Sequence, residues 1–510
     1  MKIQRLIFYF LNIVIFFFLN FHNIMFLRPQ SVHQWRQCDS AAYSLNYFQN
    51  PDANFFFPQA MTQLGYKAHV ISEFPILYWL TAKLYSVFGY HEWIARMVTY
   101  SVFLLGLIFL FEIGLRLFKQ KWFAFLPVLF LYSSPCLVYY ALNFLPNVPA
   151  FALTLFAYYL FFRYLENRDF NTFIYCSLVS VLAALLKPIE IFNYLAIFVL
   201  LLLEYYNFFR LQKVDYDKKQ VKNHVFIMFL SIFIICLWIY YAKGYADALN
   251  YKGNTLGILP IWNMEKEQID STIATFKNKW MFQLMWNPMY YVLGFLFFVN
   301  IYFFKRINKH LFLLTIFSII AQFCYVILFF DTFYHHDYYM LNVFIVPLLI
   351  LMCSIQVWET FELKKELQIT ALATVFLLFF MTLKHSRHII QNRYFGFLKE
   401  GLNENLQTIT PYLRSIGIKP TDKVVSLPDP SINISLYLMN QTGWAEGYTT
   451  DSLNTTYFAN HGAKYLIVNG EITKHPEWTT PYMKNQIGEY KGIKIYKLEN
   501  SEKLKVKSEK

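Results

Sequence analysis

Charged residues are scarce in this chain. Asp, Glu, Lys and Arg together make up only 15% of its 510 residues, whereas 57% of the residues are hydrophobic and 21% are aromatic. The mean hydropathy of +0.34 is not that of an ordinary soluble domain. The apolar residues also come in separate runs of roughly 20, the number that crosses a bilayer as a helix. We therefore predict an all-α, polytopic membrane protein.

Cysteine is also rare, and the familiar catalytic signatures are missing. None of the six cysteines belongs to a C-x-x-C pair, and five of them lie inside apolar runs, so no disulfide framework or zinc site is indicated. The chain has no G-x-x-x-x-G-K-[ST] loop, no G-x-G-x-x-G after a strand, no G-x-S-x-G and no H-E-x-x-H. The energy for any reaction would therefore come from an activated substrate and not from bound ATP.

The chain carries a formal net charge of +13, which could indicate a nucleic-acid partner. Most Lys and Arg residues, however, fall in short loops between the apolar runs, where they mark the cytoplasmic side of a membrane protein. The short loops 143–147 and 331–337 hold no Lys or Arg and are assigned to the opposite side. We therefore expect a cytoplasmic N-terminus and no nucleic-acid partner.

The apolar runs predict about eleven membrane spans. The first run ends at Leu27 with no small-residue cleavage site before Arg28, so we interpret it as a retained span and not as a signal peptide. The predicted spans lie near residues 5–27, 94–118, 122–142, 148–165, 170–187, 189–209, 224–242, 285–304, 311–330, 338–358 and 367–384. This order leaves three segments outside the cytoplasm: 28–93, 243–284 and the portion beyond residue 385.

The portion beyond residue 385 is more polar and alternates strand-like and helix-like runs, which predicts a small extracytoplasmic α/β domain over 386–500. The runs are KVVSL at 423–427, ISLYLMN at 434–440, AKYLIVNG at 463–470 and GIKIYKLE at 492–499. Residues 1–385 form the predicted membrane domain, with 28–93 as its first outer loop, and the Lys/Glu-rich residues 501–510 are predicted to be a disordered tail. Three N-x-S/T triplets could accept glycans or arise by chance; they begin at Asn433, Asn440 and Asn454.

Ionisable residues gather at the outer ends of the predicted spans, where water or substrate can offset the cost of charge in lipid. Asp39 lies in QCDSAAYSLNYF, which is helix-like and places Tyr43 and Tyr47 four and eight residues later. A carboxylate there can accept a proton from an incoming hydroxyl or hold a cation. The alternative is that Asp39 caps a helix begun by Ser40 and that Trp35 is an interfacial anchor.

Two further outer segments carry charged residues next to apolar runs. Glu73 precedes Pro75 and an apolar run, so it either lies at the positive end of a helix as a cap or contacts substrate. Lys187 interrupts two apolar runs in the turn LLKPIE, where a compact cation suits a phosphate. The alternative for Lys187 is a lysine that snorkels to the membrane surface.

The stretch YHHDYYMLN contains residues of the types that bind metals. Adjacent side chains point apart, however, so His335, His336 and Asp337 do not readily share one ion. We favour phosphate or hydroxyl binding by one histidine, with Tyr338 and Tyr339 at the membrane interface.

These motifs together resemble the membrane-embedded glycosyltransferases of the GT-C superfamily, in particular the family 39-like enzymes related to protein O-mannosyltransferases and bacterial aminoarabinose transferases. VHQWRQCDSAAY is similar to the H-x-W-R-Q-x-D signature of one bacterial branch. The resemblance implies that Asp39 is the catalytic base. SEFPILYW similarly resembles the second half of the first outer loop, with Glu73 and Pro75 in place but Phe74 where the aminoarabinose branch carries a lysine.

The later motifs carry the resemblance into the membrane domain. LLKPIE resembles the family's lysine-containing turn and implies that Lys187 contacts the lipid phosphate. HHDYYMLNVFIVP is similar to the late motif and implies donor-phosphate contacts from His336 and Tyr339. Relatives often carry an aspartate where this chain has Asn147 in LPNVP. An amide can bind a sugar hydroxyl but is not a base or a strong cation ligand, so a two-carboxylate metal site is not supported and the need for a divalent metal stays open.

The resemblance implies a glycosyltransferase that moves a hexose or pentose from a polyprenyl-phosphate donor to a glycan, lipid or protein acceptor, with either stereochemical outcome. Arg36 and His33 would supply charge and hydrogen bonds around Asp39. The enzyme would lie in a bacterial inner membrane, in contact with its lipids, and act on the extracytoplasmic side. The alternatives are a lipid or solute transporter, which would place its binding groups near the bilayer midplane in repeated halves, and a non-catalytic scaffold that binds a polyprenyl lipid.

Overall fold

The computed structural model describes residues 1–63, 73–208, 211, 218–248, 257–362, 364–445, 454–472 and 476–498, so the predicted disordered tail lies outside the described residues. Contacts divide the chain into two compact units. The first unit comprises Met1–Phe26, Arg96–Lys243 and Thr255–Gly396, and the second comprises Leu27–Ala95, Gly244–Asn254 and Phe397–Lys510. The first outer loop and the C-terminal portion therefore belong to the same unit, although several hundred residues separate them.

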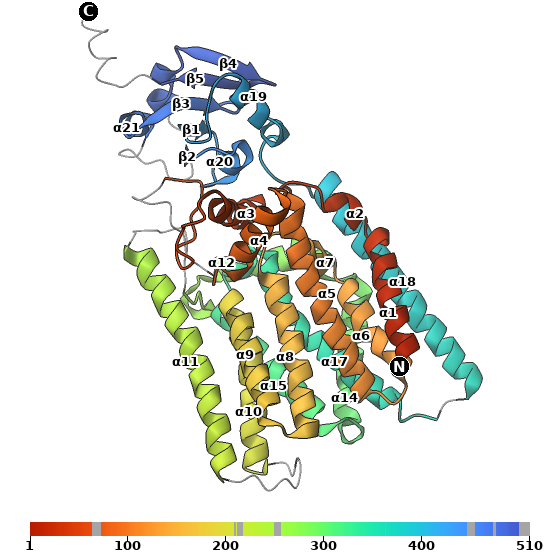
Figure 1. Cartoon of the computed structure of the whole chain (residues 1–510). Coiled ribbons are helices and arrows are strands. Elements are labelled where there is room, and N and C mark those ends of the chain that lie inside the picture. Colours follow the sequence, from red (N-terminus) through yellow and green to blue (C-terminus); the bar gives the residue numbers. More distant parts are fainter. Residues whose placement is uncertain are drawn as a thin grey trace, which may run out of the picture. The chain divides into compact units, whose positions relative to one another are not determined.

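Helices form nearly all of the first unit, where α5, α8, α9, α10 and α15 run side by side (Figure 1). In chain order the helices are α1 (Lys2–Phe18), α2 (Phe21–Ile24), α5 (Glu92–Leu117), α6 (Phe125–Tyr132), α7 (Pro135–Ala141), α8 (Asn147–Asn167), α9 (Phe170–Leu186), α10 (Ile191–Tyr205), α11 (Lys218–Ala248), α12 (Lys266–Thr275), α13 (Met281–Leu284), α14 (Asn287–Tyr302), α15 (Lys309–Leu328), α16 (Thr332–His335), α17 (Ile345–Trp358) and α18 (Lys365–Phe395). The 3-10 helix η7 (Asp337–Phe344) leads into α17.

Every predicted span coincides with a helix or a pair of helices, which confirms a polytopic membrane protein. By length and composition, seven helices in the described part of the chain can cross a membrane, or nine if each of two bent pairs is one span. The predicted number of about eleven is higher, because it also counts α1 and α9. Each of these two helices has only 17 residues.

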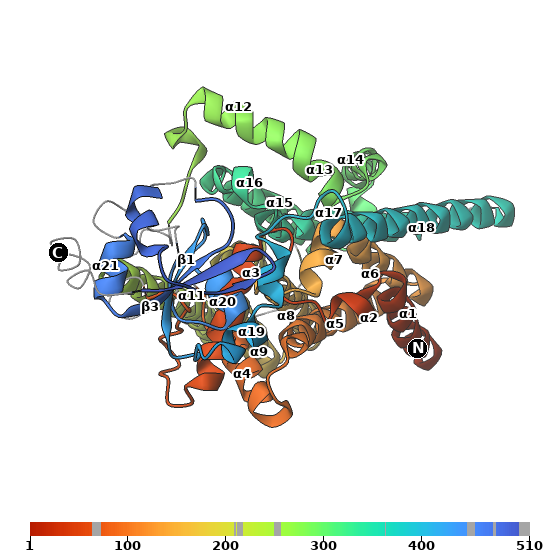
Figure 2. The same ribbon diagram turned by 90° about the horizontal axis from the view of Figure 1, so that it is seen from above.

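The two bent pairs have an identifiable cause. The chain turns by 84° between Lys121–Tyr132 and Pro135–Ala141, and by 91° between Lys266–Leu284 and Asn287–Tyr302. In each pair the second helix has a proline in its first turn, where the missing N–H is tolerated, but a proline cannot continue the preceding helix. The second bend turns α12 across the direction of α14, so α12 is seen lengthwise in the view from above (Figure 2).

The second unit contains α3 (Gln34–Gln49), α4 (Ile76–Phe88) and a five-stranded mixed sheet. Its strands are β1 (Lys423–Leu427), β2 (Gly443–Ala445), β3 (Ala463–Val468), β4 (Gln486–Tyr490) and β5 (Ile493–Lys497), in the order β2-β1-β3-β5-β4. β2 and β3 pair with β1 in parallel, and β5 is antiparallel to both β3 and β4. Three short helices accompany the sheet: α19 (Thr410–Ser415), α20 (Ile434–Met439) and α21 (Thr455–Asn460).

The sequence correctly predicted β1, α20, β3 and β5, because each is a continuous run of suitable residues. It missed β2, which is only three residues long, and β4, whose residues Gln486–Tyr490 are half exposed and include a glycine. The core of the sheet holds Leu466 and Trp444, whose ring stacks on Phe458 at 5.1 Å between centroids.

The first outer loop adds a short pairing to the edge of this sheet. The Gln63 amide donates to the Gly443 carbonyl at 2.7 Å, and the Gly443 amide donates to the Met61 carbonyl at 3.2 Å. Gly443 has φ of 152°, and a Cβ there would lie 1.9 Å from the Val424 carbonyl oxygen. Only glycine lets the loop and β1 approach β2 from both sides.

Gly443→Ala is therefore expected to lower the free energy of unfolding by about 2 kcal/mol or more, because the added methyl group overlaps the main chain of β1. Thermal unfolding of the full chain in detergent measures the change. Gly294→Ala is the matched control, because a Cβ at Gly294 meets no described atom within 4 Å. Equal unfolding temperatures for the two variants would contradict the prediction.

Candidate functional site

Helix α3 carries the Asp39 side chain. The helix begins at Gln34, with His33 at the N-cap in a left-handed conformation of φ 55°. Asp39 therefore lies well inside the helix and does not cap it, so the capping alternative is wrong. The Asp39 side chain is buried, whereas Trp35 remains 41% exposed, as an interfacial anchor would be.

Arg36, one turn before Asp39, forms an ion pair with Glu73. The Tyr78 hydroxyl lies 3.4 Å from both Arg36 and Glu73, which closes the group. Pro75 occupies the N-cap position of α4 and no side-chain hydrogen bond caps this helix, so Glu73 is placed to bind Arg36 and not to cap. Asp39, Arg36 and Glu73 are thus brought together, as the sequence suggested. Arg36, however, forms its ion pair with Glu73 and not with Asp39.

The surroundings of Asp39 suit a proton acceptor. Burial raises the pKa of Asp39 to about 7, although the charge of Arg36 opposes this rise. The negative charges of Glu73 and Asp429 add to it. Among the described residues none donates a hydrogen bond to Asp39 Oδ1. This buried oxygen therefore keeps its capacity to accept a hydrogen bond, and the carboxyl group changes charge near neutral pH.

A second group of predicted residues comes together in the first unit. Lys187 ends α9, is only 8% exposed, and has its amine 4.5 Å from the Tyr339 ring centroid and 5.7 Å from that of Tyr338. Within the described part of the chain, no hydrogen bond or ion pair reaches this amine. A snorkelling lysine would extend to the surface, whereas this one is buried against aromatic rings.

The other predicted phosphate-binding residues surround the same aromatic pair. The His336 ring lies 5.0 Å from that of Tyr338 and 5.9 Å from that of Tyr339. Asn147 donates its side-chain amide to the Tyr338 carbonyl at 3.3 Å. Lys187, His336, Tyr339 and Asn147 therefore form one cluster, which we call the lysine–tyrosine cluster.

Asp337 and Arg393 form a buried ion pair that the sequence did not indicate. Arg393 of α18 donates to Asp337 at 2.5 Å, and the Tyr140 hydroxyl donates to the other Asp337 oxygen at 2.6 Å. The carboxylate is thus already engaged, and no group of three His, Cys, Asp or Glu residues in the described ranges is placed to hold a metal. Arg393 lies 56 residues from its partner in a helix with no distinguishing motif, so the sequence held no signal for the pair.

Asn433 is the other residue that was missed as part of the site. The sequence marked it only as the start of a glycosylation triplet. In the structure its side chain is completely buried and donates to the Cys38 carbonyl at 3.2 Å, so it is not a glycan acceptor.

Residues 72–241 match the family model for dolichyl-phosphate-mannose-protein mannosyltransferases. The chain is a glycosyltransferase that is similar to this family over a third of its length. Enzymes of the family use polyprenyl-phosphate-linked sugars as donors. No curated protein matches the sequence of this chain.

Three solved structures, of two proteins, show that the glycosyltransferase has a known fold. ArnT from Cupriavidus metallidurans is 12% identical, with a TM-score of 0.60 over 97% of this chain and 98% of that one, both in the apo state and bound to undecaprenyl phosphate. The archaeal oligosaccharyltransferase AglB from Archaeoglobus fulgidus, in complex with an inhibitory peptide and a dolichol-phosphate, is 11% identical, with a TM-score of 0.51 over 90% of this chain and 70% of that one.

Glu73→Gln is expected to lower the pKa of Asp39 by roughly one unit, because it removes a nearby negative charge and releases Arg36 to stabilise the Asp39 carboxylate. The carboxyl C=O band in infrared spectra reports the protonated acid, and the pH titration of the difference between each protein and its Asp39→Asn version isolates this group. An unchanged or raised midpoint would show that Glu73 does not hold Arg36 away from Asp39.

Proposed function

We propose that this glycosyltransferase moves a hexose or pentose from a polyprenyl-phosphate donor to a hydroxyl group of an acceptor outside the cytoplasm, with Asp39 as the general base. The observation that carries the proposal is the buried Asp39 carboxyl, whose Oδ1 has no hydrogen-bond partner among the described residues and whose pKa is raised to about 7. A base of this pKa is ionised often enough to act and is basic enough to take a proton at neutral pH.

In the proposed reaction the acceptor hydroxyl gives its proton to Oδ1 of Asp39 while its oxygen forms a bond to the anomeric carbon of the sugar. The bond between this carbon and the phosphate oxygen breaks, and its electron pair leaves with the polyprenyl phosphate. The Asp39 carboxyl then returns its proton to water. Arg36 and Glu73 hold the turn of α3 that carries Asp39, and His33 begins the same helix.

We assign the leaving phosphate to the lysine–tyrosine cluster. The Lys187 amine is buried, has no anionic partner within the described ranges, and is placed over the Tyr339 ring. A fixed cation in a site of low dielectric stabilises the charge that develops on the departing phosphate. The Asn147 amide and the His336 ring are polar groups beside it and suit phosphate or sugar oxygens.

An apolar cavity in the first unit suits part of the polyprenyl chain. Its volume is about 360 Å³, and its lining includes Phe276, Tyr290, Phe330, Phe333, Met340 and Phe344. Met340 and Phe344 belong to η7, the element that also carries Tyr339. A lipid with its phosphate at Lys187 would thus have an apolar space along the same short helix.

The placement of this chemistry follows from the charge of the loops. Cytoplasmic loops hold an excess of Lys and Arg, and on this rule α3 and the C-terminal sheet face the other side of the membrane. We therefore place the enzyme in a bacterial inner membrane, where its acceptor is a glycan, a lipid or a protein on the outer side.

Asp39→Asn is expected to lower the rate of sugar transfer by about 10²- to 10⁴-fold, because the amide cannot accept the proton. The purified full chain is given dolichyl-phosphate mannose and other polyprenyl-phosphate sugars with glycan, lipid and peptide acceptors, and release of polyprenyl phosphate is measured. Wild-type activity should also fall as the pH drops through about 7, because protonation removes the base. Normal transfer by the variant would rule out Asp39 as the base, and tight lipid binding by an inactive wild-type protein would favour a scaffold.

Lys187→Met is expected to weaken binding of undecaprenyl phosphate roughly tenfold to a hundredfold, because a charge-assisted contact is lost while the apolar part of the side chain remains. Native mass spectrometry of the detergent-solubilised chain measures the binding. Lys187→Arg keeps the charge and is expected to bind more tightly than Lys187→Met. Equal affinity of the methionine variant and the wild type would place the phosphate elsewhere.

A further inference from the structure

We propose that Glu190 and Asn342 hold the turn of Lys187 against η7, so that a buried network of hydrogen bonds sets how tightly the phosphate of the donor lipid is bound. Both are positioning residues in this proposal, because they act through Lys187 and Tyr339. The inference rests on the phosphate site proposed above.

Glu190 is an ionisable residue at the start of a membrane span, Pro188–Tyr205. It ends the 3-10 helix η2 (Pro188–Glu190), which directly follows Lys187, and it is buried. In the described part of the chain no cation pairs with it; its Oε2 oxygen instead accepts hydrogen bonds from the Thr154 hydroxyl and the Asn193 amide, both at 2.7 Å. Ionisable groups within spans are costly and are kept where they serve a function, and the neighbouring function here is the proposed phosphate site.

Asn193 of α10 extends the network to two further elements. Its amide, which donates to Glu190, also donates to the side-chain carbonyl of Asn342 in η7 at 2.8 Å. The Asn193 side-chain carbonyl accepts from the amide of Gln322 in α15 at 3.0 Å. All of these side chains are buried, where each polar group needs a partner within the protein. The network therefore joins α8, which carries Thr154, with α10, α15 and η7.

Asn342 connects the network to the turn that carries Lys187. Its amide donates to the Ile189 carbonyl of η2 at 3.0 Å, across 153 positions of the chain. Asn342 lies in η7 together with Tyr339, whose carbonyl accepts from the Tyr325 hydroxyl of α15 at 2.8 Å. The two short helices that bear the lysine–tyrosine cluster are thus fastened to each other and to α15.

This fastening sets the contact between Lys187 and Tyr339. The amine lies 4.5 Å from the centroid of the ring, a distance that depends on the spacing of η2 and η7. A lysine side chain is long, and within the described ranges no ion pair holds this one. A cation stabilises a phosphate best when its place is fixed before the lipid arrives. Glu190 and Asn342 supply this fixed geometry.

The test compares undecaprenyl phosphate with undecaprenol, the same lipid without its phosphate, by native mass spectrometry of the detergent-solubilised full chain. Asn342→Leu is expected to weaken binding of undecaprenyl phosphate about tenfold and to change binding of undecaprenol by less than about twofold, because only the phosphate contact depends on the link between η2 and η7. Thr154→Val, which keeps the shape of the side chain but removes the donor to Glu190, is expected to act in the same direction.

Two further comparisons separate positioning from general stability. Glu190→Gln keeps an acceptor oxygen and should retain more of the preference for the phosphate lipid than Glu190→Leu. In the Lys187→Met background, Asn342→Leu should cause no further loss, because positioning acts through the amine.

Thr315→Val is the matched control for Thr154→Val. Thr315 is also a buried threonine of a membrane helix, but its hydroxyl donates to the Leu311 carbonyl at 2.7 Å, outside the network. This variant should leave the preference for undecaprenyl phosphate unchanged.

Equal losses for the two lipids in the network variants, or a wild-type preference in both Asn342→Leu and Thr154→Val, would overturn the proposal; if Asn342→Leu does not fold, Thr154→Val decides. A further loss on top of Lys187→Met, or Glu190→Gln no better than Glu190→Leu, would also count against it. If Lys187→Met binds undecaprenyl phosphate as the wild type does, the phosphate assignment fails and the positioning role falls with it. If only the network variants bind as the wild type does, the phosphate site stands and the positioning role alone falls.

Discussion

A buried charge without a partner is costly, and this constraint accounts for the ion pairs that the arginines of the glycosyltransferase form. Arg28 is paired with Glu92, Arg36 with Glu73, and Arg393 with Asp337. Asp39 and Lys187 differ from these groups, because within the described residues neither is held in an ion pair. Asp39 is a buried carboxyl of the second unit, and Lys187 is a cation of the first unit that lies on an aromatic ring.

The Arg36–Glu73 pair is central to this distribution of charge. A guanidinium one helical turn from Asp39 would form the direct ion pair with it if no other carboxylate were near, and the pKa of Asp39 would then be low. Because Glu73 takes the guanidinium, Arg36 stabilises the turn without forming an ion pair with Asp39. Burial then raises the pKa of Asp39, and the charge of Arg36 limits the rise.

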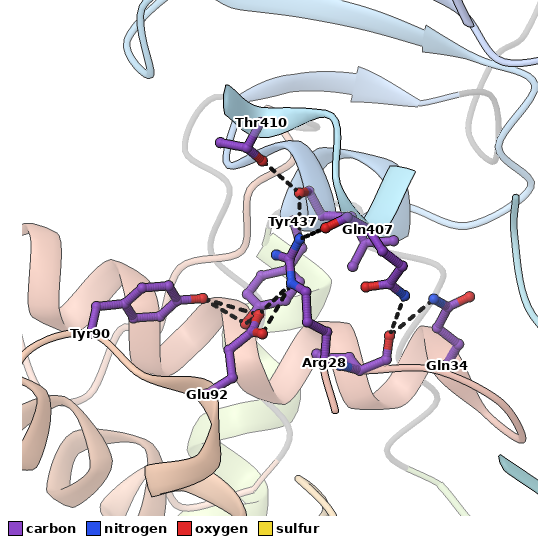
Figure 3. A network of polar contacts seen from close by, with 9 residues as sticks. Arg28, Gln34, Tyr90, Glu92, Gln407, Thr410 and Tyr437 are labelled. Carbon is purple, nitrogen blue, oxygen red and sulfur yellow. Dashed lines mark hydrogen bonds and ion pairs between the residues drawn. The ribbon is translucent and has the colours of Figure 1, made fainter. Parts of the chain in front are cut away.

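The second unit shows how two distant parts of the chain can form one compact unit. The first outer loop pairs with β2 through Met61 and Gln63, and α20 is tied to Arg28 and Glu92 (Figure 3). The sheet would otherwise stand as a separate small domain, as its alternation of strands and helix suggested. Its contacts instead place an asparagine beside a residue nearly 400 positions earlier in the chain, since 395 residues separate Asn433 from Cys38.

The sequence by itself determined the membrane helices, most strands of the sheet, and Asp39, Glu73 and Lys187 as candidates. These features depend on local composition and on the position of a charge beside a span, which the order of residues displays directly. Only the tertiary structure decided the partners: Glu73 for Arg36, 37 residues away, Asp337 for Arg393, and Asn433 for the Cys38 carbonyl. Pairing in a folded chain depends on which side chains packing brings together and on how much water it removes. Neither quantity can be obtained from spacing along the sequence.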